Sequence, residues 1–273
     1  MDLKALKDTP PWDWPKDTGK ILFDILRDDQ SAEPDRLLAA ELAGDFTIIS
    51  DDLADALLSI LGRGDVSEKV RSQAAISLGP ILDHADTEGF DDVHAIPIAE
   101  ATFHRIQESL HQLYLDADIP KDVRRRILEA SVRAPRDWHR DAVRTAYASH
   151  DETWKLTAVF CMCYVRGFDE QILDGLESKN PDIRYEAVIA AGNWEVDAAW
   201  PHVVALVTSE RTDKPLRLAA IDAVASIRPH DAAEILDELT DSDDEDIIEA
   251  VDDALAMAEG SFDEGDEDDE VIH

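Results

Sequence analysis

The sequence predicts an all-α protein, a right-handed α-solenoid of about seven stacked antiparallel helix pairs. Composition is the first support: 44% of the residues are hydrophobic, with abundant Ala, Leu and Ile, and only 6% are aromatic. This mixture favours helices over sheets. The second support is a short motif that recurs along the chain, and the third is the helical periodicity that follows each copy.

The recurring motif is an apolar residue followed by Arg and an Ala-rich helix. Clear copies begin at Val70-Arg71, Ile183-Arg184 and Leu216-Arg217. Looser copies complete a set of seven, which begin at residues 35, 70, 123, 154, 183, 216 and 247. The intervals between these starts are 35, 53, 31, 29, 33 and 31 residues, so five of the six lie near one value.

Each copy predicts the second helix of a pair. Apolar or small residues stand at offsets 0, 4, 8 and usually 11 from its start, which form one face of a helix. An amphipathic run ahead of each later copy supplies the first helix, at residues 53–61, 103–115, 138–147, 170–176, 198–207 and 232–239. Small residues at the middle offsets allow close approach, so stacked pairs bury a core that no single pair could bury.

This pattern resembles the HEAT-like repeats, in particular the short form of the bilin lyases, over residues 17–258. The resemblance implies that first helices line the convex side and second helices the concave side. It also implies that recurrent Asp and Arg residues interact along the stack, here Asp182 with Arg184 and Asp122 with Arg124. Trp154-Lys155 and Ile247-Ile248 depart from the motif. Such a repeat indicates a fold and leaves the function open.

Three segments fall outside the regular repeat. Residues 1–16 contain a Pro- and Trp-rich stretch, which we expect to cap the solenoid, with a recognition element as the alternative. Residues 86–102 form an insertion that is either a contact loop or a plain surface loop. Residues 259–273 read as a disordered acidic tail, which either keeps the protein soluble or docks to a basic surface.

The formal net charge of -36 repels phosphate backbones and anionic lipids, so nucleic acid is an unlikely partner. Adaptation of the host to high salt is another interpretation of this charge. One strip, residues 121–144, carries eight basic residues against four acidic ones. Such a strip suggests an anionic ligand or an acidic segment of a partner, although acidic neighbours in the fold could also neutralise it.

The candidate partner-binding residues follow from the strip and from the repeat. On the second helices, side chains at offsets 2, 3 and 6 should point away from the core. Arg and aromatic residues there would act as anchors in an interface. The candidates are Arg125, Arg126, Arg133, Arg136 and Arg140 in the strip, and Tyr185, Glu186 and Trp194 in a later second helix.

No catalytic motif is recognisable in the sequence, and we expect no cofactor. Cys161 and Cys163 read as small buried residues, because an offset of two places them on different sides of a helix. A metal site is an alternative only in the insertion, where His84, Asp86, Asp91, Asp92 and His94 lie close in sequence.

We therefore expect a non-catalytic scaffold or adaptor that binds a protein partner on its concave helix surface. The identity of that partner is not encoded in any motif. We expect a cytoplasmic monomer without membrane association, because no run of 18 apolar residues is present. The resemblance implies a first alternative, a bilin-lyase-like chaperone or enzyme that acts on a tetrapyrrole-carrying partner. A second is a nucleic-acid-binding HEAT-like protein similar to certain DNA glycosylases, which the charge disfavours.

Overall fold

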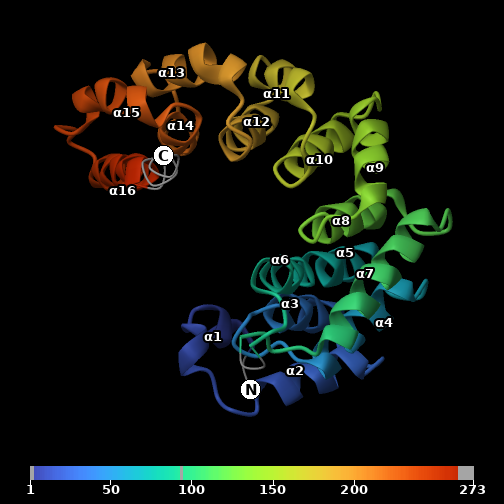
Figure 1. Cartoon of the computed structure of the whole chain (residues 1–273). Helices are drawn as coiled ribbons and strands as arrows, with labels where there is room; N and C mark the ends of the chain where they lie inside the picture. The colour runs from blue at the N-terminus through green and yellow to red at the C-terminus, as the bar shows by residue number, and fades with distance from the viewer. Residues whose placement is uncertain (1–2, 93–94, 264–273) are drawn as a thin grey trace, which may run out of the picture. The chain divides into compact units, whose positions relative to one another are not determined.

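The structure is a computed structural model that describes residues 3–92 and 95–263. Within these residues it contains α-helices and short 3-10 helices and no β-strand, which confirms the predicted all-α class (Figure 1). The chain forms two compact units, residues 1–142 and 143–273. The boundary between them falls within α9 (Asp137–Tyr147).

The first unit is a two-layered stack of three helix pairs. Each second helix packs on its own first helix, and neighbouring second helices within the unit pack on one another. The first helices likewise pack on one another, so both layers are continuous (Figure 1). The first-helix layer contains α2 (Thr18–Arg27), α4 (Asp51–Gly62) and α7 (Glu100–Leu115), and the second-helix layer contains α3 (Glu33–Ala43), α5 (Glu68–Ser77) and α8 (Lys121–Ser131).

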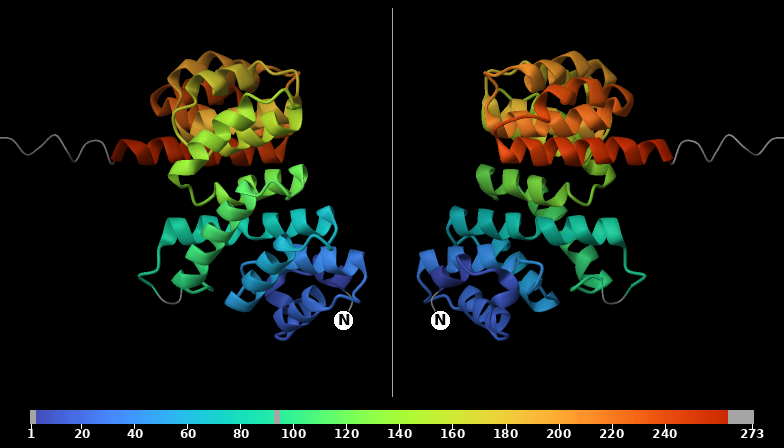
Figure 2. Two further views of the ribbon diagram at one scale, coloured as in Figure 1. Left: turned by 90° about the vertical axis from the view of Figure 1, so that its right-hand side faces the viewer. Right: turned by 90° about the vertical axis from the view of Figure 1, so that its left-hand side faces the viewer.

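The second unit repeats this arrangement. Its first-helix layer contains α11 (Asp169–Leu176), α13 (Trp200–Thr208) and α15 (Pro229–Leu236), with 3-10 turns before α13 and after α15. Its second-helix layer contains α10 (Glu152–Met162), α12 (Pro181–Asn193), α14 (Lys214–Ile227) and α16 (Glu245–Asp263). Each of these second helices packs on the next, and α16, with 19 residues, extends beyond the others (Figure 2).

The repeat register of the sequence is confirmed in detail. All seven second helices begin two residues before the predicted start of their repeat, from α3 at residue 33 to α16 at residue 245. The offsets that were expected to face the core do so: Val70, Ala74, Leu78 and Ile81 are each at most 1% exposed. The 3.6-residue period of the helix brings these offsets onto one face, which is why the register could be predicted.

Local capping explains where several helices begin. Ser50 and Ser67 accept a hydrogen bond from the backbone N–H three residues later, at the starts of α4 and α5. Asn180 and Asp213 cap α12 and α14 in the same way, and a Pro follows each cap in the first turn. Side-chain acceptors satisfy N–H groups that have no partner within the helix, and Pro has no such N–H to satisfy.

The Arg of the repeat motif ties the two helices of a pair together. The Nε atom of Arg71 donates to the carbonyl oxygen of Leu61 at 3.0 Å, and that of Arg217 donates to the carbonyl oxygen of Val207 at 2.9 Å. Both carbonyls lie at the end of the preceding first helix, where backbone oxygens lack a partner within the helix. In these two repeats the Arg therefore stabilises its own pair.

Small residues set how closely the second helices approach. A Cβ atom added to Gly44, at the end of α3, would lie 2.5 Å from the carbonyl oxygen of Ser77 in α5. One added to Gly192 in α12 would lie 3.1 Å from the Cα atom of Ala223 in α14. Larger side chains at these positions would force the neighbouring helices apart.

The N-terminal segment packs on the first unit. Leu3 and Leu6 in α1 (Leu3–Lys7) are buried, and α1 contacts α3. A 3-10 turn, Pro11–Asp13, follows. The indole of Trp14 then donates to the carbonyl oxygens of Leu6 and Thr9 at 3.0 and 2.9 Å, which folds the segment back on itself.

The insertion is more ordered than a projecting loop. A further helix, α6 (Gly79–Glu88), follows α5 and takes up the first residues of the expected insertion. After it, Ile96 and Ile98 are buried, and the ring of Phe90 lies 5.5 Å from that of Phe103 in α7. Within the described residues the insertion is therefore packed against the first unit.

At the C-terminal end, α16 continues to Asp263 and so includes the first residues of the expected acidic tail. The rest of the tail, residues 264–273, lies outside the described residues. Among the helices that the structure describes, none combines the length and the apolar character needed to cross a membrane.

Candidate functional site

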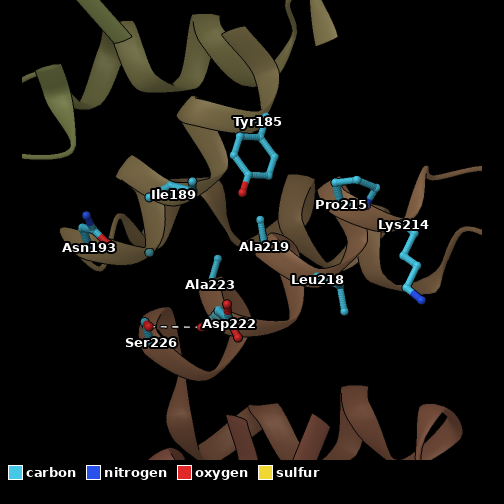
Figure 3. A pocket seen from close by; sticks show the side chains of 11 residues that line it. Tyr185, Ile189, Asn193, Lys214, Pro215, Leu218, Ala219, Asp222, Ala223 and Ser226 are labelled. Atoms are coloured by element: carbon cyan, nitrogen blue, oxygen red, sulfur yellow. Dashed lines mark hydrogen bonds between the residues drawn. The ribbon is translucent and has the colours of Figure 1, made fainter. Parts of the chain in front are cut away.

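A groove between α12 and α14, both in the second unit, is the candidate binding site (Figure 3). Its cavity measures about 540 Å³. Two stripes of side chains with helical spacing form its walls: Tyr185, Ile189 and Asn193 from α12, and Pro215, Leu218, Ala219, Asp222 and Ser226 from α14. The opposite faces of both helices are buried in the core, so these stripes are the exposed faces of the two helices.

The repeat offsets explain which residues reach the groove. Offsets 2 and 6 of α12 are Tyr185 and Ile189, and offsets 2, 3 and 6 of α14 are Leu218, Ala219 and Asp222. All five line the groove. Tyr185 is the one residue of this lining that was predicted from the sequence. Leu218, Ala219 and Asp222 occupy the same offsets of their own repeat, and this periodicity is the sequence signal that marks them.

Tyr185 presents an aromatic ring and a hydroxyl to the groove. The residue is 36% exposed, and in Figure 3 its hydroxyl points toward Ala219 on the facing helix. A Tyr in this position offers apolar area together with one hydrogen-bonding group, which is typical of interface anchors.

The other two candidates on α12 lie outside the groove lining. Glu186 is half-buried, and its carboxylate lies 4.0 Å from the Sγ atom of Cys163. Trp194 caps the end of α12 and donates through its indole nitrogen to the carbonyl oxygen of Met162 at 2.5 Å. The Arg166 guanidinium lies 4.7 Å from the centre of the Trp194 ring. Trp194 thus links α12 to the end of α10.

Three arginines of the basic strip are engaged by acidic residues of the first unit. Arg125 and Arg126 both bond the carboxylate of Glu129, at 2.8 and 2.5 Å. Arg133 bonds Asp83 of α6 at 3.3 Å. Arg125 and Arg126 share one carboxylate, so these three arginines are paired with two acidic side chains of the fold.

Arg136 lies in a second, polar pocket of about 450 Å³ in the first unit, lined also by His104, Gln107, Glu108, His111 and Trp138. Its guanidinium donates to the Gln107 side-chain oxygen at 2.7 Å. Trp138 stacks on His111, with ring centres 4.5 Å apart. Arg140 is exposed one helical turn later, outside this pocket.

Next to Trp138 of this pocket lies the buried imidazole of His139, which was not among the residues predicted from the sequence. His139 is 1% exposed, and its ring centre lies 3.7 Å from that of Trp138. Its Nδ1 atom accepts from the backbone N–H of Arg136 at 2.9 Å, and its Nε2 atom lies 3.1 Å from the hydroxyl of Ser131. Burial lowers the pKa of His139 to about 4, so the ring is neutral at pH 7.

No metal-binding cluster of three or more His, Cys, Asp or Glu side chains occurs among the described residues. His84 lies 3.2 Å from the carbonyl oxygen of Ala95, and its ring packs against Phe46. His94, another member of the considered metal site, lies outside the described residues. Cys161 and Cys163 are buried and are not joined by a disulfide.

Comparisons with known proteins bear on the fold. Residues 170–256 match the family model for HEAT repeats, which spans α11 to α16 and the groove. The comparison with curated proteins found no significant match.

Three solved structures are similar over most of the chain. YibA of E. coli is 15% identical, with a TM-score of 0.50, over 98% of this chain and 91% of that one. Human deoxyhypusine hydroxylase in complex with glycerol is 17% identical, with a TM-score of 0.41, over 94% and 88%. An engineered protein is 19% identical, with a TM-score of 0.37, over 90% and 98%.

At these identities the similarity concerns the fold alone, and only the likeness to YibA reaches a TM-score of 0.5. The likeness to YibA agrees with the stacked helix pairs of both units and with the family match in the second unit. Residues 170–256 are HEAT repeats, and stacked helix pairs of the same kind make up both units.

Proposed function

We propose that the chain is a non-catalytic protein-interaction scaffold and that the groove between α12 and α14 holds a segment of a partner protein. The observation that carries this proposal is the groove itself, an open cavity of about 540 Å³ between the exposed faces of two stacked second helices. Stacked repeats build such extended surfaces, and binding to them needs no chemistry beyond shape and contact.

The lining suits a peptide better than a small polar metabolite. Ile189, Pro215, Leu218 and Ala219 offer apolar contact, and Tyr185 adds an exposed aromatic ring. Apolar side chains around an aromatic anchor are the usual centre of a protein interface. The high acidity of the chain disfavours nucleic acid as the occupant.

A variant that fills the groove tests the proposal. Ala219→Trp places an indole in the cavity, whereas Ala233→Trp adds the same side chain to an exposed position of α15. The immobilised full chain and both variants would be panned against a phage-displayed library of random 12-residue peptides. Circular dichroism would establish that all three proteins retain their helices.

We expect the wild-type protein and Ala233→Trp to enrich a common set of peptides and Ala219→Trp to lose that set. Enrichment of the same peptides by all three proteins would overturn the assignment of the groove. Failure of the wild-type protein to enrich any peptide would overturn the proposal of a peptide-binding scaffold.

A further inference from the structure

The groove between α12 and α14 contains one acidic side chain that the fold leaves without a counter-ion. Asp222 of α14 lines the cavity, and its carboxylate forms no ion pair with any residue that the structure describes. The one basic residue of the lining, Lys214, bonds Asp244 at 2.7 Å and also pairs with Asp246, both at the start of α16. Its ammonium is therefore already neutralised.

Asp222 is an exposed residue of the groove, yet its surroundings still disfavour the charged form of its carboxyl. Burial raises the pKa of the Asp222 carboxyl, and the nearby carboxylate of Asp253 in α16 raises it further. Apolar walls replace part of the water that would otherwise solvate the charge. A cation brought into the groove would lower this cost, whereas an acidic side chain would increase it.

The neighbouring side chains define what such a cation must be attached to. Leu218 and Ala219 of α14 line the groove together with Asp222, and Ile189 lines it from α12; in Figure 3 the Ala219 side chain points toward Tyr185. A long aliphatic stem that ends in a positive charge matches this combination, since Lys and Arg bury their methylene groups while the charged end reaches an acceptor. The Tyr185 hydroxyl adds a second polar group at the wall of the groove.

We propose that the partner segment carries a Lys or Arg whose stem lies along Leu218 and Ile189 and whose charged end pairs with Asp222. This inference rests on the proposed function, because it names the class of segment that the groove binds. The segment is an apolar peptide with one central basic residue. Asp222 selects that residue, and the apolar walls supply most of the contact area.

The test uses two variants of the full chain, each of which removes one negative charge. Asp222→Asn removes the charge and keeps the shape of the side chain. Asp243→Asn removes the same charge from an exposed position outside the groove, and so controls for the general acidity of the unit. Each protein would be panned against the same random 12-residue library, and the enriched sequences would be compared.

The strongest wild-type peptide would then be synthesised with its basic residue intact and with norleucine in its place. We expect the norleucine peptide to bind the wild-type protein and Asp243→Asn about tenfold more weakly, as for loss of one partly buried charge pair. On Asp222→Asn we expect the two peptides to bind within about twofold of each other.

The outcomes separate this inference from the proposed function. One outcome is that the peptides bound by the wild-type protein and lost by Ala219→Trp show no enrichment of Lys or Arg. That outcome would overturn the inference but would leave the groove as a peptide-binding site. The same holds if Asp222→Asn still distinguishes the basic peptide from its norleucine analogue. Peptides that Ala219→Trp retains would overturn both.

Discussion

The buried imidazole of His139 should make the stability of the protein depend on pH below neutrality. Its pKa is about 4 in the folded protein, whereas an unperturbed His titrates near about 6.5. Between these values the unfolded chain binds a proton that the folded protein does not. The free energy of unfolding must then fall as the pH falls from about 6.5 toward 4, and this contribution is absent above about 6.5.

The size of the effect follows from the pKa difference. A difference of roughly 2.5 units corresponds to about 3 kcal/mol when the full range is traversed. Between pH 7.5 and pH 5 the linkage gives a loss of about 2 kcal/mol, because titration of the folded form has hardly begun at pH 5. In a chain with marginal stability this is a large fraction of the total.

Urea denaturation at several pH values from 5 to 7.5 measures this loss. The matched variants are His139→Gln, which removes the buried ring, and His150→Gln, which removes an exposed one. His139→Gln should be less stable at pH 7.5 but should lose about 2 kcal/mol less than the wild-type protein on going to pH 5. His150→Gln should follow the wild-type profile.

The reasoning would be refuted if wild-type and His139→Gln proteins lost the same free energy between pH 7.5 and pH 5. An NMR titration of the His139 ring with a midpoint near about 6.5 would refute it as well, since the burial seen in the structure would then not hold in solution.

Two further predictions concern packing. Gly44→Ala should destabilise the first unit by about 1–3 kcal/mol in thermal melts, because the added Cβ would lie 2.5 Å from the Ser77 carbonyl oxygen. The control is Gly62→Ala, whose Cβ would meet nothing within 4 Å and which should be neutral or slightly stabilising in the same melts. Arg71→Leu should cost about 1–3 kcal/mol in urea denaturation, since it leaves the buried carbonyl of Leu61 without its donor; an unchanged midpoint would show that the Arg does not join the two helices of its pair.

Much of the fold could be predicted because its determinants are local. Helix periodicity and side-chain caps act within a few residues, so the starts of all seven second helices were predictable with a constant offset of two residues. Pairing of Arg125 and Arg126 with Glu129 was also within reach of the sequence, because residues three and four apart share a helix face.

Other features depend on residues that are far apart in the chain. Asp83 and Arg133 are 50 residues apart and meet only because α6 packs beside α8. The division into two compact units has no signal in the repeat spacing, which runs through the boundary in α9. The burial of His139 likewise follows from the packing of α9 and its neighbours, and not from the residue type.

The groove shows where the two kinds of information divide. The sequence determined which side chains point away from the core, since offsets 2, 3 and 6 of a helix are fixed by its period. Only the tertiary structure decided that α12 and α14 form a cavity and that Lys214 is paired at α16 while Asp222 is not. The physical reason is that a helix face depends on neighbours along the chain, whereas a cavity and its charge balance depend on neighbours in space.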